Sequence, residues 1–333
     1  MTQISSLYVV DDAAFDRHVP PASHPDKPAR LAAARRGLGQ TGYTPVQARP
    51  ATEAELARAH DAEYLKKLFA WNGRTGEIAA ETYVSPGSVD AALLAAGACI
   101  ELAKKVQSAP NSIGFALLRP PGHHAVRAGA GGFCLLNNVA VAACELLQQG
   151  MSRVAIVDWD VHHGNGTQDI FYAEPRVYYI STHQAPPCYP GTGWSHETGE
   201  GAAQGTTLNL PMAPYSGDED CKKIWLDRLL PALRAFRPEA ILVSAGYDAS
   251  ERDPLAEMQF TPAAYAWMAS QLLEVAREFT QGRLTLILEG GYDDDALEAG
   301  IAATLTGLGL SGLSPAFPFV PGETRATQQD PQL

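Results

Sequence analysis

The sequence lacks the features that place a chain in or across a membrane. No stretch reaches the length of about 18 consecutive apolar residues that a membrane-spanning helix needs. The first residues show no basic region followed by an apolar stretch and a small-residue cleavage site, as a secretory signal requires. We therefore expect a cytoplasmic protein that does not use a membrane as a partner.

Cysteine and positive charge are also scarce. The five cysteines are an odd number without CxxC spacing, and we interpret them as reduced, mostly buried thiols. The formal net charge of −12 argues against nucleic acid as a partner, because phosphates require a basic surface. An acidic surface would attract cationic substrates such as lysine-rich peptides or polyamines, although it can equally serve solubility alone.

The chain shows no internal repeat and no low-complexity linker. Hydrophobic residues make up 46% of it and charged residues 19%, which is typical of a globular protein. We expect one domain over residues 1–319 and a flexible C-terminal tail over 320–333.

Short apolar runs rich in β-branched residues alternate with helical patterns. Ala- and Leu-rich spacing predicts helices over 88–105 and 138–149, and Thr261 and Pro262 begin another helix that stops at Gly282. This alternation predicts right-handed βαβ units and an open parallel sheet. The predicted buried strands are 113–118, 154–157, 177–180, 240–243 and 284–288.

The segments that follow these strands carry most of the candidate chemistry. They read, in chain order, RPPGHHA, DWDVHHGNG, STH, SAGYDA and EGGYD. Ligands of open α/β sheets bind beyond the carboxyl ends of the strands, so we expect the five segments to converge on one site.

Asp160, His162 and Asp248 are candidate metal ligands. Asp160 and His162 are two residues apart, so both side chains point to the same side of an extended segment. Asp248 follows another predicted strand. Three protein ligands leave a position open for water, which is typical of a catalytic zinc site, although ligand type alone does not separate zinc from ferrous iron. The alternative is that these side chains only cap backbone groups.

Two adjacent histidines and a tyrosine are candidates for catalytic roles. His123 and His124 lie on a stiff proline-containing loop, and histidine has the pKa closest to neutrality for a general base. Asp158 and Asn165 are available to orient them. Tyr292 follows two glycines and could donate a hydrogen bond to a developing oxyanion.

Phe133 and Tyr189 are candidate walls of a narrow apolar slot, because Phe133 follows a glycine and Tyr189 precedes a Pro-Gly pair. Ordinary core packing remains the alternative for both rings.

Together, RPPGHHA, GFCLLNN, DWDVHHGNGTQ, YPGTG, SAGYDA, DPL and LEGGYD resemble the histone deacetylase family. The likeness is greatest to its class II branch and to bacterial deacetylase-like amidohydrolases, and it runs from about His24 to about residue 310. It implies the arginase/deacetylase fold, a single α/β domain with an open, mostly parallel eight-stranded sheet flanked by helices. It also implies a zinc-dependent amidohydrolase that removes acetyl or other acyl groups from Nε-acyl-lysine through a metal-activated water.

The resemblance assigns a role to each candidate catalytic residue. It implies that Asp160, His162 and Asp248 hold one zinc ion, and that Tyr292 polarises the amide carbonyl together with the zinc. Asp158 resembles the acidic partner of the first histidine. Asparagine at 165 is a class II trait at a position where class I members carry aspartate, which would make His124 less basic. The implied catalytic set is His123, His124, Tyr292, Asp158 and Asn165.

The resemblance also implies substrate contacts and two sites for structural K⁺ or Na⁺. Gly132 resembles the residue whose carbonyl accepts from the substrate amide, and Phe133 and Tyr189 resemble the tunnel walls. The first cation site would use Asp158, Asp160, His162, Ser181 and Thr182. The second would use backbone oxygens of Phe171, Glu174, Val177 and Thr206.

The sequence leaves two possible substrate classes, acylated lysine peptides and acetylated small amines. The polyamine-selective eukaryotic branch carries an acidic gatekeeper in a DPE segment, where this chain has Leu255. An apolar residue offers no charge to a secondary ammonium and so favours acyl-lysine, although Glu81 could supply a charge at the rim.

Two further alternatives change the chemistry. A dinuclear manganese ureohydrolase on the same fold needs an extra carboxylate after Asp248, where this chain has Ala249 and Ser250. A non-catalytic acyl-lysine-binding protein would have a damaged site, whereas Tyr292 is intact.

Overall fold

The computed structural model describes residues 4–310, so the predicted tail at 320–333 and the predicted end of the domain at 319 lie outside the described residues. At its centre is an eight-stranded sheet in the order β2-β1-β5-β10-β9-β6-β7-β8, in which every strand pair is parallel. The predicted α/β fold with an eight-stranded parallel sheet is confirmed. The strands are β1 Ser6–Asp11, β2 Thr44–Pro45, β5 Ser112–Leu117, β6 Val154–Asp158, β7 Val177–Gln184, β8 Thr207–Met212, β9 Ala240–Ala245 and β10 Leu284–Leu288.

The five predicted strands are the central ones of the sheet and β7. They are buried along their whole length, and so they appear in the sequence as continuous apolar runs. Strand β7 continues to Gln184, four residues beyond its predicted end. The prediction stopped early because the last residues of the strand are polar, although they are buried. The prediction missed β1, β2 and β8. Strand β8 contains Pro211, which an edge strand tolerates, and β2 is only two residues long.

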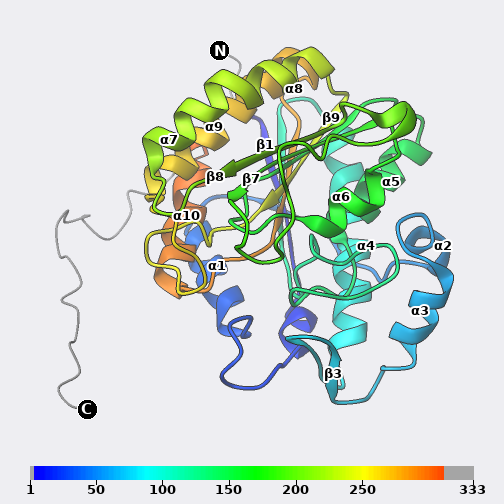
Figure 1. The fold of residues 1–333 in the computed structure, drawn as a ribbon. Coiled ribbons are helices and arrows are strands. Elements are labelled where there is room, and N and C mark those ends of the chain that lie inside the picture. The colour runs from blue at the N-terminus through cyan, green and yellow to red at the C-terminus, as the bar shows by residue number, and fades with distance from the viewer. Residues whose placement is uncertain (1–3, 311–333) are drawn as a thin grey trace.

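Helices cover both faces of the sheet. Helices α4 and α5 contact each other on one face, and α10 packs between α1 and α9 on the other (Figure 1). The predicted helices are confirmed as α4, α5 and α9. The helices are α1 Ala29–Leu38, α2 Glu53–Leu56, α3 Ala62–Phe69, α4 Ser88–Gln107, α5 Asn138–Gln148, α6 Asn165–Phe171, α7 Asp218–Ile224, α8 Leu230–Phe236, α9 Pro262–Phe279 and α10 Asp294–Gly307.

Five short elements complete the architecture. A two-stranded antiparallel hairpin, β3 and β4, lies outside the main sheet. Helix α7 continues into α8 through a π-helical turn. The remaining elements are β3 Gly76–Ala79, β4 Thr82–Val84, the 3₁₀ turns Ala13–Arg17 and Gly201–Ala203, and the π turn Trp225–Leu229.

Local sequence explains where the site-bearing segments begin and end. The Thr261 hydroxyl accepts a hydrogen bond from the Ala263 N–H at 3.2 Å and begins α9, as predicted, while the helix ends at Phe279, before Gly282. Asp293 caps α10 through the Ala296 N–H at 2.8 Å. This cap fixes the start of α10 two residues after Tyr292.

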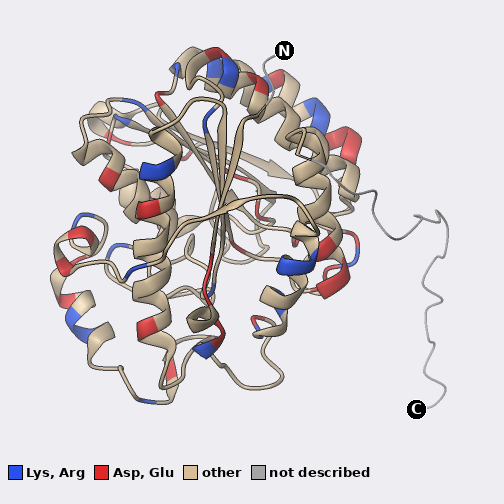
Figure 2. Cartoon of the chain, turned by 180° about the vertical axis from the view of Figure 1, so that it is seen from behind, with Lys and Arg blue, Asp and Glu red and all other residues tan. Residues whose placement is uncertain are grey.

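Most of the charged residues lie on the outside of the molecule. Lys, Arg, Asp and Glu alternate over the outer helices, whereas the central strands are almost free of them (Figure 2). All five cysteines are free and three of them are buried, in agreement with their interpretation as thiols. Over residues 4–310, no helix combines the length and apolar character needed to cross a membrane.

Candidate metal centre and catalytic residues

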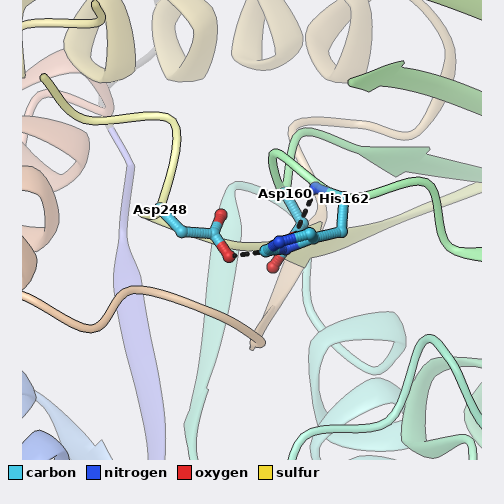
Figure 3. A group of neighbouring side chains, drawn as sticks. All are labelled: Asp160, His162 and Asp248. Carbon is cyan, nitrogen blue, oxygen red and sulfur yellow. Dashed lines mark hydrogen bonds and ion pairs between the residues drawn. The ribbon is translucent and has the colours of Figure 1, made fainter. Parts of the chain in front are cut away.

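The carboxyl ends of β6 and β9, which are neighbours in the sheet, bring the three candidate metal ligands together. Asp160 and His162 follow β6, and Asp248 follows β9 (Figure 3). One ligand atom from each residue lies within 4.8 Å of the other two, and all three residues are buried. His162 Nδ1 lies 3.2 Å from Asp160 Oδ1 and 3.2 Å from Asp248 Oδ2.

Backbone N–H groups orient the two carboxylates. Asp160 Oδ2 accepts from Gly290 N at 2.8 Å, and Asp248 Oδ1 accepts from Val161 N at 2.9 Å. Burial and the adjacent charge of Asp160 raise the pKa of Asp248. Two buried carboxylates that face one imidazole nitrogen therefore need a positive partner, and this donor set, with one position left open, suits a divalent zinc ion.

Glycines surround these side chains where nothing larger fits. A Cβ atom at Gly246 would overlap Asp160 Oδ2, and one at Gly290 would overlap Asp248 Oδ2. Gly132 packs in the same way against the His124 ring. The backbone itself therefore forms part of the wall of the site.

Each histidine of the pair has its own acceptor. His123 Nδ1 lies 3.0 Å from Asp158 Oδ2, and His124 Nδ1 lies 2.8 Å from Asn165 Oδ1, at the start of α6. The ring centroids are 4.0 Å apart. Tyr179 also donates to Asp158 Oδ2, at 3.1 Å, which the sequence did not indicate. His123 Nε2 lies 3.7 Å from Asp160 Oδ1, so it is the Nε2 of His124 that is left for chemistry.

The two rings differ in charge. Burial opposes the charged form of His123, but Asp160 and Asp158 outweigh it and raise the pKa of His123 to about 10. Burial lowers the pKa of His124 well below its usual value, and the charges of His123 and His162 lower it further. The shift of His124 favours the neutral ring, as a general base must be, whereas that of His123 favours the charged ring.

Tyr292 lies two residues after Gly290, whose N–H binds Asp160, and its hydroxyl is protonated. It is 9% exposed, and burial raises the pKa of its phenol well above the usual value. Its ring meets the Phe133 ring edge to face, with centroids 5.7 Å apart. A neutral phenol next to a metal centre is a hydrogen-bond donor for an oxyanion.

A buried ion network that the sequence did not reveal supports the Tyr292 segment. Arg30 donates to the carbonyls of Gly291 at 2.6 Å and Glu289 at 2.5 Å, and its guanidinium lies 4.8 Å from the centroid of the Tyr292 ring. Asp26 pairs with Arg30 at 2.6 Å. Arg119 binds the same carboxylate at 2.8 Å.

Glu289 is a second buried group that sequence reasoning missed. Its carboxylate accepts from Gly122 N at 2.6 Å and His123 N at 3.2 Å, so it fixes the backbone of the loop that carries His123 and His124. Burial raises the pKa of Glu289 to about 7. The only sequence signal was an acidic residue at the end of a buried strand, in EGGYD.

The four predicted substrate-binding residues differ in their contacts and exposure. The Gly132 carbonyl accepts from the Cys134 thiol at 3.2 Å, and Phe133 has a positive φ of 69°. The Tyr189 ring lies 5.0 Å from the His124 ring and is 45% exposed. Leu255 is 37% exposed.

The residues of the first predicted cation site are all buried, and Asp158 pairs in register with Ser181 on the next strand. The Thr182 hydroxyl oxygen is buried without a partner among the described residues. At the second predicted site, the Phe171 carbonyl accepts from Glu174 N at 3.0 Å and the Glu174 carbonyl accepts from Val177 N at 3.2 Å. The Thr206 carbonyl accepts from Tyr179 N at 3.0 Å.

Comparison with known proteins gives consistent matches. A family model described as the histone deacetylase domain matches residues 24–308, close to the predicted span of resemblance. The Archaeoglobus fulgidus protein "Probable deacetylase" is 38% identical over 94% of this chain and 90% of its own length. The Pseudomonas aeruginosa "Histone deacetylase-like amidohydrolase" is 36% identical over 83% of this chain and 74% of its own length. The crystal structure of the HDA15 HD domain has a TM-score of 0.86 at 38% identity and covers 92% of this chain and 89% of that one.

Proposed function

The chain belongs to the histone deacetylase family, and from this premise we propose that it is a zinc-dependent deacetylase that removes acetyl or other acyl groups from Nε-acyl-lysine. The observation that carries the proposal is the convergence of Asp160, His162 and Asp248 within 4.8 Å, at the sheet edge that also bears a neutral histidine. A structural zinc site would be closed by a fourth protein ligand, whereas this group has three.

Zinc bound by these three residues would polarise the acyl carbonyl and lower the pKa of the attacking water. His124 Nε2 takes a proton from this water while Asn165 holds Nδ1 of the same ring at 2.8 Å. The Tyr292 hydroxyl donates a hydrogen bond to the developing oxyanion. The protonated His124 then delivers its proton to the leaving amine, and the positive charge of His123 favours the anionic transition state.

The approach to the centre suits a linear acyl-amine. The Phe133 ring contacts Tyr292 and the Tyr189 ring contacts His124, which supports the proposal that these two rings would flank the acyl-lysine chain. The Gly132 carbonyl would accept a hydrogen bond from the substrate amide. At the rim, Leu255 is apolar and partly exposed, which favours the alkyl stem of lysine over a polyamine with a second ammonium group.

K⁺ or Na⁺ would bind beside the centre in a structural role. Asp158 and Ser181 lie opposite each other on neighbouring strands, and the Thr182 hydroxyl oxygen, which has no partner within residues 4–310, would be a ligand for such a cation. The second predicted site, at Phe171, Glu174, Val177 and Thr206, offers only backbone carbonyls.

A substrate panel on the zinc-loaded protein tests the proposal. It should contain acetyl- and longer acyl-lysine peptides together with N-acetylputrescine. We expect turnover of acyl-lysine peptides that stops when zinc is removed by a chelator and returns when zinc is added. Faster turnover of N-acetylputrescine would select the acetylpolyamine alternative, which the net charge of −12 also suits. Peptide binding without hydrolysis would select the non-catalytic one.

A further inference from the structure

The carboxylate of Asp253 is buried beside the candidate site, and the mechanism above gives it no role. The residue is 7% exposed. Its Oδ2 accepts a hydrogen bond from Tyr292 N at 2.6 Å, and its Oδ1 accepts one from Leu255 N at 3.0 Å. Asp253 therefore joins the backbone of the oxyanion donor to the backbone of a rim residue.

The loop that carries Asp253 is anchored at its base. A β-bridge pairs Ser250 with Phe260, and Phe260 N donates to the Ala249 carbonyl at 3.0 Å. Asp253 N donates to the Ser250 carbonyl at 2.9 Å. The same loop begins at the end of β9 with Asp248. The Asp253 carboxylate is therefore fixed relative to a candidate metal ligand.

The segment before Tyr292 has little stiffness of its own. Gly290 and Gly291 precede it, and Gly291 has a φ of 120°, in a region that side-chain-bearing residues avoid. Glycines leave the backbone many conformations, so hydrogen bonds must decide where the tyrosine sits. Asp253 binds its N–H, and Arg30 holds the carbonyl of Gly291 at 2.6 Å.

We propose that Asp253 is a positioning residue that holds the Tyr292 hydroxyl at its working distance from the metal centre, by tying the Tyr292 backbone to the loop that bears Asp248. The inference rests on the proposed function, because it requires Tyr292 to act as the oxyanion donor. The N–H groups of Tyr292 and Leu255 each need a hydrogen-bond acceptor on the side chain of residue 253. A carboxylate provides both, whereas a carboxamide of the same shape provides one.

A double-mutant cycle between Asp253→Asn and Tyr292→Phe tests this coupling. We expect Asp253→Asn alone to lower kcat roughly 10- to 100-fold with KM for an acetyl-lysine peptide nearly unchanged, because misplacement affects the transition state. In the Tyr292→Phe background, the same substitution should lower kcat by less than about 2-fold, because the hydroxyl that it positions is absent. Burial and Asp248 raise the pKa of Asp253 to about 7, so we would assay at about pH 8.5, where the carboxylate is ionised.

Asp295→Asn is the matched control. Asp295 lies three residues after Tyr292, its side chain is 72% exposed, and it pairs at 3.0 Å with Arg252, the neighbour of Asp253 in the chain. We expect this variant to keep kcat within about 2-fold of the native chain. Zinc content and the denaturant midpoint, measured on every variant, would separate positioning from loss of the metal or of the fold.

Two results would overturn the positioning role. One is full kcat in Asp253→Asn, and the other is an equal loss in the native and Tyr292→Phe backgrounds, which would mean a general structural effect. If Asp253→Asn does not fold, Asp253→Ser, which still offers one acceptor, takes its place in the same cycle. Native-like turnover by Tyr292→Phe alone would instead contradict the proposed function, so the two failures are distinguishable.

Discussion

The floor of the site and its rim are built differently. The floor comprises Asp160, His162 and Asp248, which are all buried. The two carboxylates accept hydrogen bonds from backbone N–H groups in the segments that follow β10 and β6. The rim comprises Tyr189 and Leu255, which are 45% and 37% exposed. The floor is rigid because the sheet positions it, and it should determine the reaction. The rim contacts solvent, tolerates change, and should determine the substrate.

Removal of one floor ligand should have the largest effect. Asp248→Asn keeps the size of the side chain but removes a charge from the metal centre. We expect zinc to be lost on dialysis and kcat to fall roughly 1000-fold or more, because several kcal/mol of transition-state stabilisation come from the metal. Zinc analysis and peptide turnover measure this. Asp227→Asn, at an exposed carboxylate paired with Lys223 at 2.7 Å, should behave as the native chain; a zinc-free but active Asp248→Asn would contradict the metal mechanism.

Loss of the Tyr292 hydroxyl should come next. We expect Tyr292→Phe to bind zinc normally and to lose on the order of 100- to 1000-fold in kcat, the usual cost of one oxyanion donor. The control is Tyr247→Phe in the adjacent loop, whose hydroxyl bonds to Thr304 at 3.2 Å. It removes a buried hydroxyl of the same kind and should lower stability without lowering kcat. Equal kcat losses in the two variants would remove the special role of Tyr292.

Acid should destabilise the fold through His60, which lies outside both the floor and the rim and binds Val126 and Asn137. His60 Nδ1 donates to the Val126 carbonyl at 3.1 Å, and its Nε2 accepts from Asn137 N at 2.9 Å, so only the neutral ring satisfies both bonds. Burial lowers the pKa of His60 to about 4 from 6.5, so the unfolded chain binds a proton first as the pH falls.

We therefore expect His60 to remove up to about 3 kcal/mol from the free energy of unfolding as the pH falls from 6.5 to 4. The contribution is fully present above pH 6.5. Urea unfolding of the native chain and of His60→Gln across this range measures it. The variant should start less stable, since Gln replaces only part of the bonding, and should show a shallower decline with acid. Parallel declines would mean that other groups cause the acid sensitivity.

Changes at the rim should have the smallest effect on rate and a visible effect on preference. We expect Tyr189→Phe to change kcat by only a few-fold, because the hydroxyl is not in the reaction path. Leu255→Glu should raise the ratio of N-acetylputrescine to acetyl-lysine turnover by about 5-fold, the effect of one exposed charge pair. Leu226→Glu, at an exposed leucine outside the rim, is the control. If Leu255→Glu abolished all turnover, the division between floor and rim would be wrong.

The floor was predictable because its residues are local features of the chain. Asp160 and His162 have the i, i+2 spacing of an extended segment, and Asp248 follows an apolar run that is typical of a buried strand. The supporting groups were not predictable in this way. Arg30 lies on α1 and contacts the Gly291 carbonyl, 261 residues further along the chain. Its own neighbourhood, ARLAAARRGL, shows only an ordinary helix with several arginines.

The strands of the fold also divide into those that the sequence predicted and those that it did not. Buried central strands are apolar throughout and were identified, whereas β8 combines partial exposure with Pro211 and was missed. The DPL segment was visible in the sequence, but the hydrogen bond from Tyr292 N to Asp253 joins two loops and depends on their packing. Periodicity identifies which face of an element is buried, and it carries no information about which loops meet.

The glycines that line the floor limit how this chain can change by mutation. At Gly246 and Gly290 even a methyl group would collide with a carboxylate of the centre, and at Gly132 it would collide with the His124 ring. In a saturation library selected for activity, these three positions should accept no replacement, while Tyr189 and Leu255 should accept many. New substrate preferences can therefore arise by single substitutions at the rim, whereas a new metal chemistry would require the backbone of two strand ends to move at once.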